Sequence, residues 1–162
     1  MNQTITEKLI VYLKEHGMTI TTAESCTGGM ISSAIVNVPG ASDVLNEAYV
    51  TYANESKMRL LGVKAETLES LGAVSDRTAR EMAEGVLKAA NADCSIAVTG
   101  IAGPDGGTPE KPVGTVFAGF AIGSRTWVRE YHFTGSRQEV REKTTQTVLE
   151  ELYTQLTSFR MA

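Results

Sequence analysis

The sequence contains few of the residues that build disulfide frameworks and metal sites. Its 162 residues include two cysteines and two histidines, and Cys26 and Cys94 show no metal-ligand spacing. Two separate cysteines are typical of a protein whose thiols stay reduced, as they do in the cytoplasm. We therefore expect a cytoplasmic protein without structural disulfides or a bound metal.

Long hydrophobic runs and strong positive charge are also missing. No apolar run approaches the roughly 20 residues of a membrane span, and the segment 1–4 has no signal-peptide character. The net charge of −4 argues against a nucleic-acid partner, because neutralising a phosphate backbone takes a basic surface. We expect neither a membrane nor a nucleic acid as partner, although a local cluster of donors could still hold one phosphate.

The remaining composition is that of an ordinary globular protein. Hydrophobic residues make up 42% of the chain and charged residues 21%. The length suits one hydrophobic core, and there is no repeat, low-complexity segment or linker. We expect a single domain over residues 1–162.

The order of helical and strand patterns predicts the fold class. Helical patterns alternate with short strands over the first two thirds of the chain, and a hairpin and a final helix follow. This order predicts an α/β fold with three layers, α/β/α, and a mixed sheet. The expected helices begin near residues 5, 30, 55, 75 and 136, and the expected strands are 18–23, 48–52, 94–98, 115–122 and 126–133.

The most informative run is 21–29, Thr-Thr-Ala-Glu-Ser-Cys-Thr-Gly-Gly. It is typical of a strand that ends in a hydroxyl-rich, glycine-containing turn and opens a helix. Such a turn exposes backbone N–H groups and places Ser25 where a substrate could meet it. The simpler interpretation is that Ser25 only caps the helix.

Two further segments complete a possible site. Lys57, in the run 52–57, could take the proton of Ser25, although a helical lysine is most often a solvated surface charge. Tyr52 could equally be a half-buried core aromatic. The glycine-rich segment 99–107 could close the site, and it lacks the Gly-Lys-Ser/Thr of a phosphate-binding Walker loop. Together the three segments predict a small hydrolase for an anionic, nucleotide-like substrate.

Cys26 is an alternative nucleophile because it follows Ser25 directly. A reactive thiolate needs a base, and His16 and His132 lie in unrelated segments. We therefore interpret Cys26 as a small buried residue.

Four stretches, 23–29, 52–57, 72–75 and 99–107, resemble the nicotinamide-mononucleotide deamidases and occur in that family's order. This family also forms the C-terminal domain of the competence-damage-inducible protein CinA. The resemblance covers essentially the whole chain. It is to the stand-alone form, since the N-terminal domain of the two-domain members has no counterpart here.

The resemblance implies hydrolysis of the carboxamide of nicotinamide mononucleotide to nicotinic acid mononucleotide and ammonia, without a metal or other cofactor. The family's serine, tyrosine and lysine match Ser25, Tyr52 and Lys57. Family members often carry serine and alanine where this chain has Ala53 and Ser56, which leaves those three residues intact. The resemblance also suggests a homodimer.

These matches give each candidate residue a chemical role. Ser25 would attack the carboxamide carbon, Lys57 would act as its base if burial lowered its pKa, and Tyr52 would relay the proton or hold Lys57. The N–H groups of residues 26–29 are candidates for the oxyanion hole. The remaining expected substrate-binding residues are Thr27, Gly28, Gly29, Thr99, Gly100, Gly103 and Arg137. The competing hypotheses are a non-catalytic nucleotide-binding regulatory module and a hydrolase of another small amide.

Overall fold

The strands form one mixed sheet in the computed structural model, which describes residues 2–158, so Met1 and residues 159–162 of the expected domain lie outside it. The strand order is β2-β1-β3-β4-β5. β1 pairs in parallel with β2 and β3, whereas β3–β4 and β4–β5 are antiparallel, so the predicted mixed sheet is confirmed. The strands are β1 (Ile20–Glu24), β2 (Tyr49–Val50), β3 (Cys94–Gly100), β4 (Thr115–Ile122) and β5 (Arg125–His132).

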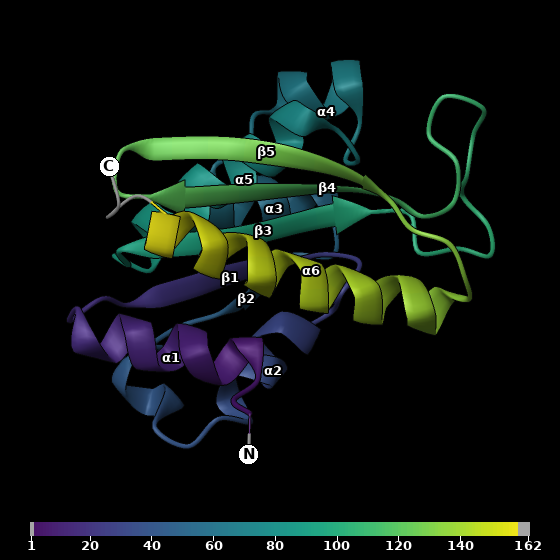
Figure 1. Cartoon of the computed structure of the whole chain (residues 1–162). Coiled ribbons are helices and arrows are strands. Elements are labelled where there is room, and N and C mark those ends of the chain that lie inside the picture. The colour runs from purple at the N-terminus through teal and green to yellow at the C-terminus, as the bar shows by residue number, and fades with distance from the viewer. Residues whose placement is uncertain (1, 159–162) are drawn as a thin grey trace.

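Helices cover both faces of the sheet, which confirms the α/β/α layers (Figure 1). One face carries α1 (Ile5–Glu15), α2 (Met30–Val36) and α6 (Arg137–Ser158), and the other carries α3 (Asn54–Leu61), α4 (Ala65–Leu71) and α5 (Asp76–Ala89). The helix α4 and the short 3₁₀ helix Ala41–Asp43 were not predicted. No helix of the described residues is long and apolar enough to cross a bilayer.

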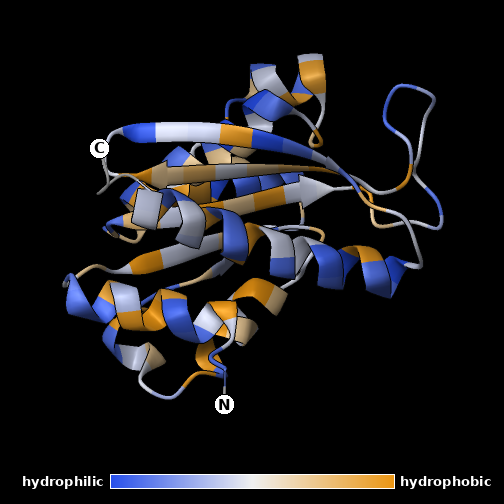
Figure 2. Cartoon of the chain, viewed as in Figure 1, coloured by the Kyte–Doolittle hydropathy of each residue, from blue (hydrophilic) through white to orange (hydrophobic). Residues whose placement is uncertain are grey.

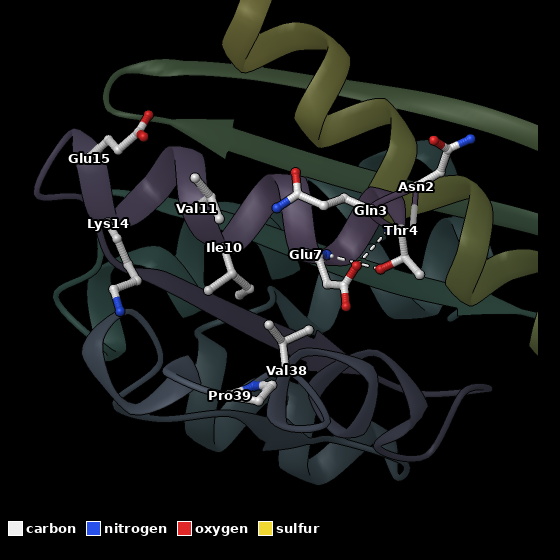
Figure 3. A pocket seen from close by; sticks show the side chains of 10 residues that line it. All are labelled: Asn2, Gln3, Thr4, Glu7, Ile10, Val11, Lys14, Glu15, Val38 and Pro39. Atoms are coloured by element: carbon white, nitrogen blue, oxygen red, sulfur yellow. Dashed lines mark hydrogen bonds between the residues drawn. The ribbon is translucent and has the colours of Figure 1, made fainter.

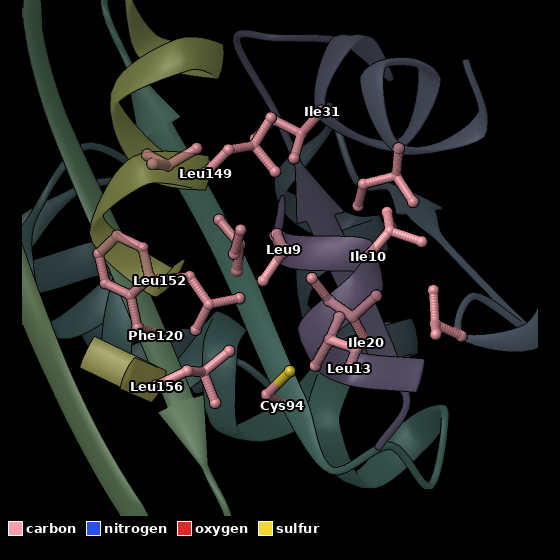
Figure 4. Packing of buried hydrophobic residues seen from close by; sticks show 14 of the residues in the cluster. Leu9, Ile10, Leu13, Ile20, Ile31, Cys94, Phe120, Leu149, Leu152 and Leu156 are labelled. Carbon is pink, nitrogen blue, oxygen red and sulfur yellow. The ribbon is translucent and has the colours of Figure 1, made fainter. Parts of the chain in front are cut away.

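The main core lies between the sheet and the layer of α1, α2 and α6. Apolar residues are frequent on β1 and β4, while β5 and much of α6 carry polar residues (Figure 2). β3 is buried from Cys94 to Thr99, as expected for a strand covered on both faces. The side chains that meet in this core include Leu9, Leu13, Ile20, Ile31, Phe120, Leu149 and Leu152 (Figure 4).

Capping residues fix where several of the expected helices begin. Thr4 and Glu7 form a capping box at α1, and the Ser75 side chain accepts the N–H of Thr78 at α5. At α6, the N–H of Glu139 donates to Ser136 Oγ and the N–H of Ser136 donates to the Glu139 carboxylate. This last box sets the start of the helix that reaches the candidate site.

The sheet topology brings the segments 25–29, 52–57 and 99–107 to the carboxyl ends of neighbouring parallel strands. From β1 the chain runs to β2 on one side, whereas β3 pairs on the other side of β1, so the strand order reverses between β1 and β3. Ligands of open α/β sheets bind outside the carboxyl ends of the strands at such a point. Segment 25–29 follows β1, and the loop 101–114 extends past the end of β3 beside the first turns of α6 (Figure 1).

Gly85 lets α5 pack directly against α3, the helix that carries Lys57. A Cβ atom at this position would lie 1.8 Å from the carbonyl oxygen of Leu61. Helix propensity alone predicts that Gly85→Ala stabilises α5 by about 1 kcal/mol. The contact with Leu61 predicts the opposite, a destabilisation of about 1–3 kcal/mol, because the two helices must separate.

Urea unfolding of Gly85→Ala shows whether the substitution raises or lowers the free energy of unfolding. Glu84→Ala, at an exposed neighbouring position of α5, is the matched control and should change the free energy of unfolding by no more than about 0.5 kcal/mol. An alanine variant as stable as the parent protein would contradict the close packing of the two helices.

Candidate active site

The structure brings Ser25 and Lys57 into contact. The N–H of Ser25 donates to the Val98 carbonyl at 3.1 Å, which continues the pairing of β1 with β3 by one residue. Lys57 Nζ, from α3, lies 3.1 Å from Ser25 Oγ. Two motifs that are 32 residues apart in sequence therefore meet at the carboxyl end of β1.

Lys57 is buried, with only 1% of its surface exposed. Its Nζ donates to the carbonyl oxygens of Thr51 at 2.7 Å and Tyr52 at 3.2 Å, in addition to its contact with Ser25. None of the salt bridges of the described residues includes this amine. Burial lowers the pKa of Lys57 below the ordinary lysine value, and negative charge on the neighbouring Cys26 thiolate would oppose that shift.

As an ammonium, Lys57 can donate one N–H to each of its three partners, Ser25 Oγ and the carbonyls of Thr51 and Tyr52. The same three contacts can also be satisfied by the neutral amine, which the lowered pKa makes more accessible. A neutral amine has two N–H donors and one lone pair. The carbonyls of Thr51 and Tyr52 can accept the two N–H groups, which leaves the lone pair for the hydroxyl of Ser25. In this form Lys57 can act as a base toward Ser25, as nucleophilic catalysis by serine requires.

Within the turn after β1, two of the four expected oxyanion-hole donors already have protein acceptors. The N–H of Gly28 donates to the Ser25 carbonyl at 3.1 Å, and that of Gly29 donates to Glu24 Oε1 at 3.2 Å. The N–H groups of Cys26 and Thr27 donate to no other described residue. Because the C=O and N–H of a trans peptide point in opposite directions, the Ser25 carbonyl that faces Gly28 turns the Cys26 N–H out of the turn.

Gly28 and Gly29 shape the turn, and their expected role in substrate binding stays a prediction. Both residues have positive φ angles, +58° and +106°, a region that favours glycine. Their N–H groups are already occupied within the turn.

The hydroxyls of Thr27 and Thr99 donate to protein groups, and the expected contact of these residues with a substrate stays a prediction. Both residues are buried, and Thr27 Oγ1 donates to Glu24 Oε1 at 2.7 Å while Thr99 Oγ1 donates to the Ala73 carbonyl at 2.7 Å. Gly100 and Gly103 serve close packing. A Cβ atom would lie 2.7 Å from a Val116 methyl at residue 100 and 2.5 Å from a Val113 methyl at residue 103.

Tyr52 and Arg137 meet at the exposed rim of the site. The Tyr52 side chain is 63% exposed, so the interpretation as a half-buried core aromatic is wrong. Arg137 donates to the Tyr52 hydroxyl at 3.3 Å and to the Gly103 carbonyl at 2.8 Å. The Tyr52 group that contacts Lys57 is its backbone carbonyl, and its phenol contacts Arg137 instead.

Cys26 is buried, as the sequence predicted. Only 7% of its surface is exposed, and burial raises the pKa of its thiol to about 11. A thiol with this pKa is protonated at neutral pH and is a poor nucleophile. The environment of Cys26 therefore favours Ser25 as the attacking group.

Two residues of the site have no counterpart in the sequence predictions. Glu24 is fully buried beneath the turn, and Arg141 of α6 donates to the carbonyls of Cys26 and Thr27, each at 3.0 Å. The sequence contained a signal for the role of Glu24. The helix α2 begins after two glycines and therefore has no N-cap side chain, so another residue must accept its first N–H groups. The contact of Arg141 spans more than a hundred residues and left no local signal.

One groove of the described residues lies apart from this centre. This open groove runs along α1 and is lined by Ile10, Val11, Val38 and Pro39 among others, and no residue of the Ser25 turn borders it (Figure 3). Within residues 2–158, no group of three or more His, Cys, Asp or Glu side chains is arranged to hold a metal ion.

Comparison with known proteins gives one consistent family. The family model of the CinA C-terminal domain matches residues 2–156. A competence-damage inducible protein of Clostridium perfringens (strain SM101) is 52% identical over 153 residues, which cover 94% of this chain and 37% of the relative. A protein of the same description from Acetivibrio thermocellus is 58% identical over 132 residues, 82% of this chain and 32% of the relative. The chain thus spans about a third of the length of these curated relatives.

Solved structures agree with the sequence comparison. The competence/damage inducible protein CihA of Agrobacterium tumefaciens superposes with a TM-score of 0.88 at 41% identity, covering 94% of this chain and 97% of the other. A CinA superfamily protein of Enterobacter cloacae superposes with a TM-score of 0.91 at 39% identity, covering 96% and 95%.

Proposed function

The chain belongs to the CinA C-terminal domain family, and on this basis we propose that it hydrolyses the carboxamide of nicotinamide mononucleotide. The products are nicotinic acid mononucleotide and ammonia. The single observation that carries the proposal is the buried Lys57 amine, 3.1 Å from Ser25 Oγ and without a carboxylate partner. An activated serine beside a proton carrier is the requirement for cleaving an amide through an acyl-enzyme.

In the first half of the reaction, Ser25 replaces the amide nitrogen. Lys57 Nζ takes the hydroxyl proton as Ser25 Oγ bonds to the carboxamide carbon, whose oxygen becomes an oxyanion. Lys57 then gives this proton to the amide nitrogen, the C–N bond breaks and ammonia leaves. Protonation of the nitrogen is essential because an amide anion is a very poor leaving group.

The second half returns the enzyme to its starting state. A water molecule attacks the ester carbon while Lys57 takes one of its protons. The C–O bond to Ser25 then breaks, the proton returns to Ser25 Oγ, and nicotinic acid mononucleotide leaves. The N–H groups of Cys26 and Thr27 are the proposed donors to both oxyanions, and one such donor is worth about 3 kcal/mol.

The direct test is conversion of nicotinamide mononucleotide by the purified, chelator-treated protein. Ammonia and nicotinic acid mononucleotide should form in equal amounts. Nicotinamide riboside and nicotinamide serve as comparison substrates without phosphate. Binding of the mononucleotide without release of ammonia would instead support the regulatory module, and release from other amides alone would support a different amidohydrolase.

Arg137 is the proposed ligand of the substrate phosphate. It is exposed at the rim, and its guanidinium can form paired hydrogen bonds with phosphate oxygens. Arg137→Gln should raise KM for the mononucleotide about 10- to 100-fold, as expected for loss of a hydrogen bond to a charged group, with a smaller change in kcat. Steady-state kinetics with the mononucleotide and the riboside measure this effect.

Arg129→Gln is the control for this variant, because Arg129 of β5 pairs with Glu151 of α6 and lies outside the Ser25 turn. It should leave KM unchanged. If Arg137→Gln raised KM for the riboside as much as KM for the mononucleotide, Arg137 would not recognise the phosphate.

A further inference from the structure

Glu24 is a buried carboxylate that holds together the turn containing Ser25. Its surface is 0% exposed, and its two oxygens accept hydrogen bonds from five donors. These donors are Thr27 Oγ1 and the N–H groups of Gly29 and Ile31 to Oε1, and the Ser32 N–H and Thr22 Oγ1 to Oε2, at 2.7, 3.2, 2.8, 3.0 and 3.4 Å.

This arrangement replaces an ordinary helix cap. The N-cap residue of α2 is Gly29, which offers no side-chain acceptor to the free N–H groups of the first turn. A serine or aspartate at this position would normally satisfy one of them. Glu24, at the end of β1, accepts hydrogen bonds from three backbone N–H groups at the start of α2. One side chain therefore connects the strand, the turn and the helix.

Arg141 holds the same turn from the opposite side. Its Nε donates to the Cys26 carbonyl and its Nη2 donates to the Thr27 carbonyl. Since the N–H of Thr27 shares a peptide plane with the Cys26 carbonyl, that N–H must point away from Arg141. Glu24 thus occupies N–H groups of segment 24–32, and Arg141 occupies carbonyls of the same segment.

We propose that Glu24 and Arg141 are positioning residues that set Ser25 Oγ against Lys57 and aim the N–H groups of Cys26 and Thr27 at the oxyanion. This inference rests on the proposed amidohydrolase function. Neither side chain touches the reacting atoms, because Glu24 is buried beneath the turn and Arg141 acts through backbone carbonyls.

The energetic cost of the arrangement supports a role in positioning. Burying a carboxylate is unfavourable unless many hydrogen bonds compensate it, and none of the salt bridges of residues 2–158 includes Glu24. A neutral cap would satisfy the seven-residue α2 without that cost. A rigid turn has a catalytic benefit, since a misplacement of about 1 Å can cost about 100-fold in rate.

The test compares turnover in variants of the two residues. Glu24→Gln keeps the shape of the side chain but replaces one acceptor oxygen with a donor. We expect kcat for nicotinamide mononucleotide to fall about 10- to 100-fold with KM changed less than about twofold. Arg141→Met should behave in the same way, and Arg141→Lys, which can reach one carbonyl at a time, should be intermediate. Circular dichroism and thermal melts verify that each variant is folded at the assay temperature.

Glu81→Gln is the matched control for Glu24→Gln. Glu81 of α5 is a largely buried carboxylate that accepts a hydrogen bond from Thr67, and it lies outside the Ser25 turn. This variant should keep the parent kcat and KM. A comparable loss of kcat in Glu81→Gln would show that the effect of Glu24→Gln is general loss of structure.

A second readout does not depend on the substrate. The rate at which a fluorophosphonate labels Ser25, followed by peptide mass spectrometry, reports the reactivity of the nucleophile itself. It should fall in Glu24→Gln and Arg141→Met together with kcat. If the parent protein is labelled at Ser25 but releases no ammonia, the proposed function fails while the labelling rates still test the positioning role.

Two results would overturn the inference. Variants of Glu24 and Arg141 that are labelled and turn over at the parent rate would show that the turn needs neither side chain. A rise in KM at unchanged kcat in Arg141→Met would make Arg141 a substrate ligand instead.

Discussion

Ser25→Ala is expected to lower kcat for ammonia release from nicotinamide mononucleotide by about 10⁴-fold or more while substrate binding persists. Alanine cannot form the ester with the carboxamide carbon, and the buried Cys26 thiol, with a pKa of about 11, does not replace it. The small side chain leaves the rim residues Tyr52 and Arg137 in place. A continuous ammonia assay measures the rate, and calorimetric titration measures binding.

Two control variants make this result specific. Ser33→Ala changes an exposed serine of the neighbouring helix α2 and should keep the parent rate. Cys26→Ala should lower the rate by less than about tenfold, since it removes only a buried packing group. Loss of activity in Cys26→Ala together with activity in Ser25→Ala would assign the nucleophile to the cysteine.

Lys57→Met is expected to lower kcat by about 10²- to 10⁴-fold, the usual contribution of a general acid and base. Methionine has a similar length and is apolar, so it fits the buried site, and it leaves the carbonyls of Thr51 and Tyr52 without the Lys57 donor. Circular dichroism verifies that the variant is folded. The parent protein should gain activity as pH rises through the lowered pKa of Lys57, because only the neutral amine accepts the serine proton. This rise should be missing from the residual activity of Lys57→Met.

The same pKa shift predicts how stability depends on pH. Between the lowered pKa of folded Lys57 and the ordinary lysine value of 10.5, the unfolded chain binds one more proton than the folded protein. The free energy of unfolding therefore increases with pH in this window, and below it the full cost of the buried charge remains. Lys57→Met should remove this increase, which urea titrations at several pH values measure.

Lys64→Met is the control, because Lys64 is exposed at the start of α4. It should alter neither the rate nor the pH dependence of stability. A Lys57→Met protein with a near-normal rate and an unchanged pH profile would exclude Lys57 as the base.

Much of the fold was predictable because local signals agree with the tertiary structure. The capping boxes at Thr4 and Ser136 mark true helix starts, and the apolar run after Cys94 is a buried strand. The helix α4 escaped prediction for a physical reason. It has seven residues, buries Thr67 alone and has no capping side chain at Lys64, so its sequence shows neither an apolar stripe nor a start signal.

The site was less predictable because burial, rather than residue type, decides what its side chains do. A helical lysine is ordinarily solvated, whereas Lys57 is buried and donates to the carbonyls of residues 51 and 52. Thr27 and Thr99 have the chemistry of substrate ligands, yet both hydroxyls bind protein groups. Sequence motifs thus identify which segments meet, whereas contacts between distant segments determine the role of each atom.

The most direct test of the central claim, an acyl-enzyme on Ser25, uses the phenyl ester of nicotinic acid mononucleotide. Phenol is a good leaving group, so acylation should outpace deacylation and the intermediate should accumulate. We predict a burst of about one equivalent of phenol per enzyme, with a nicotinoyl mononucleotide adduct on the peptide that contains Ser25 in acid-quenched samples. Steady turnover of the ester with no burst, or an adduct on Cys26, would contradict the account.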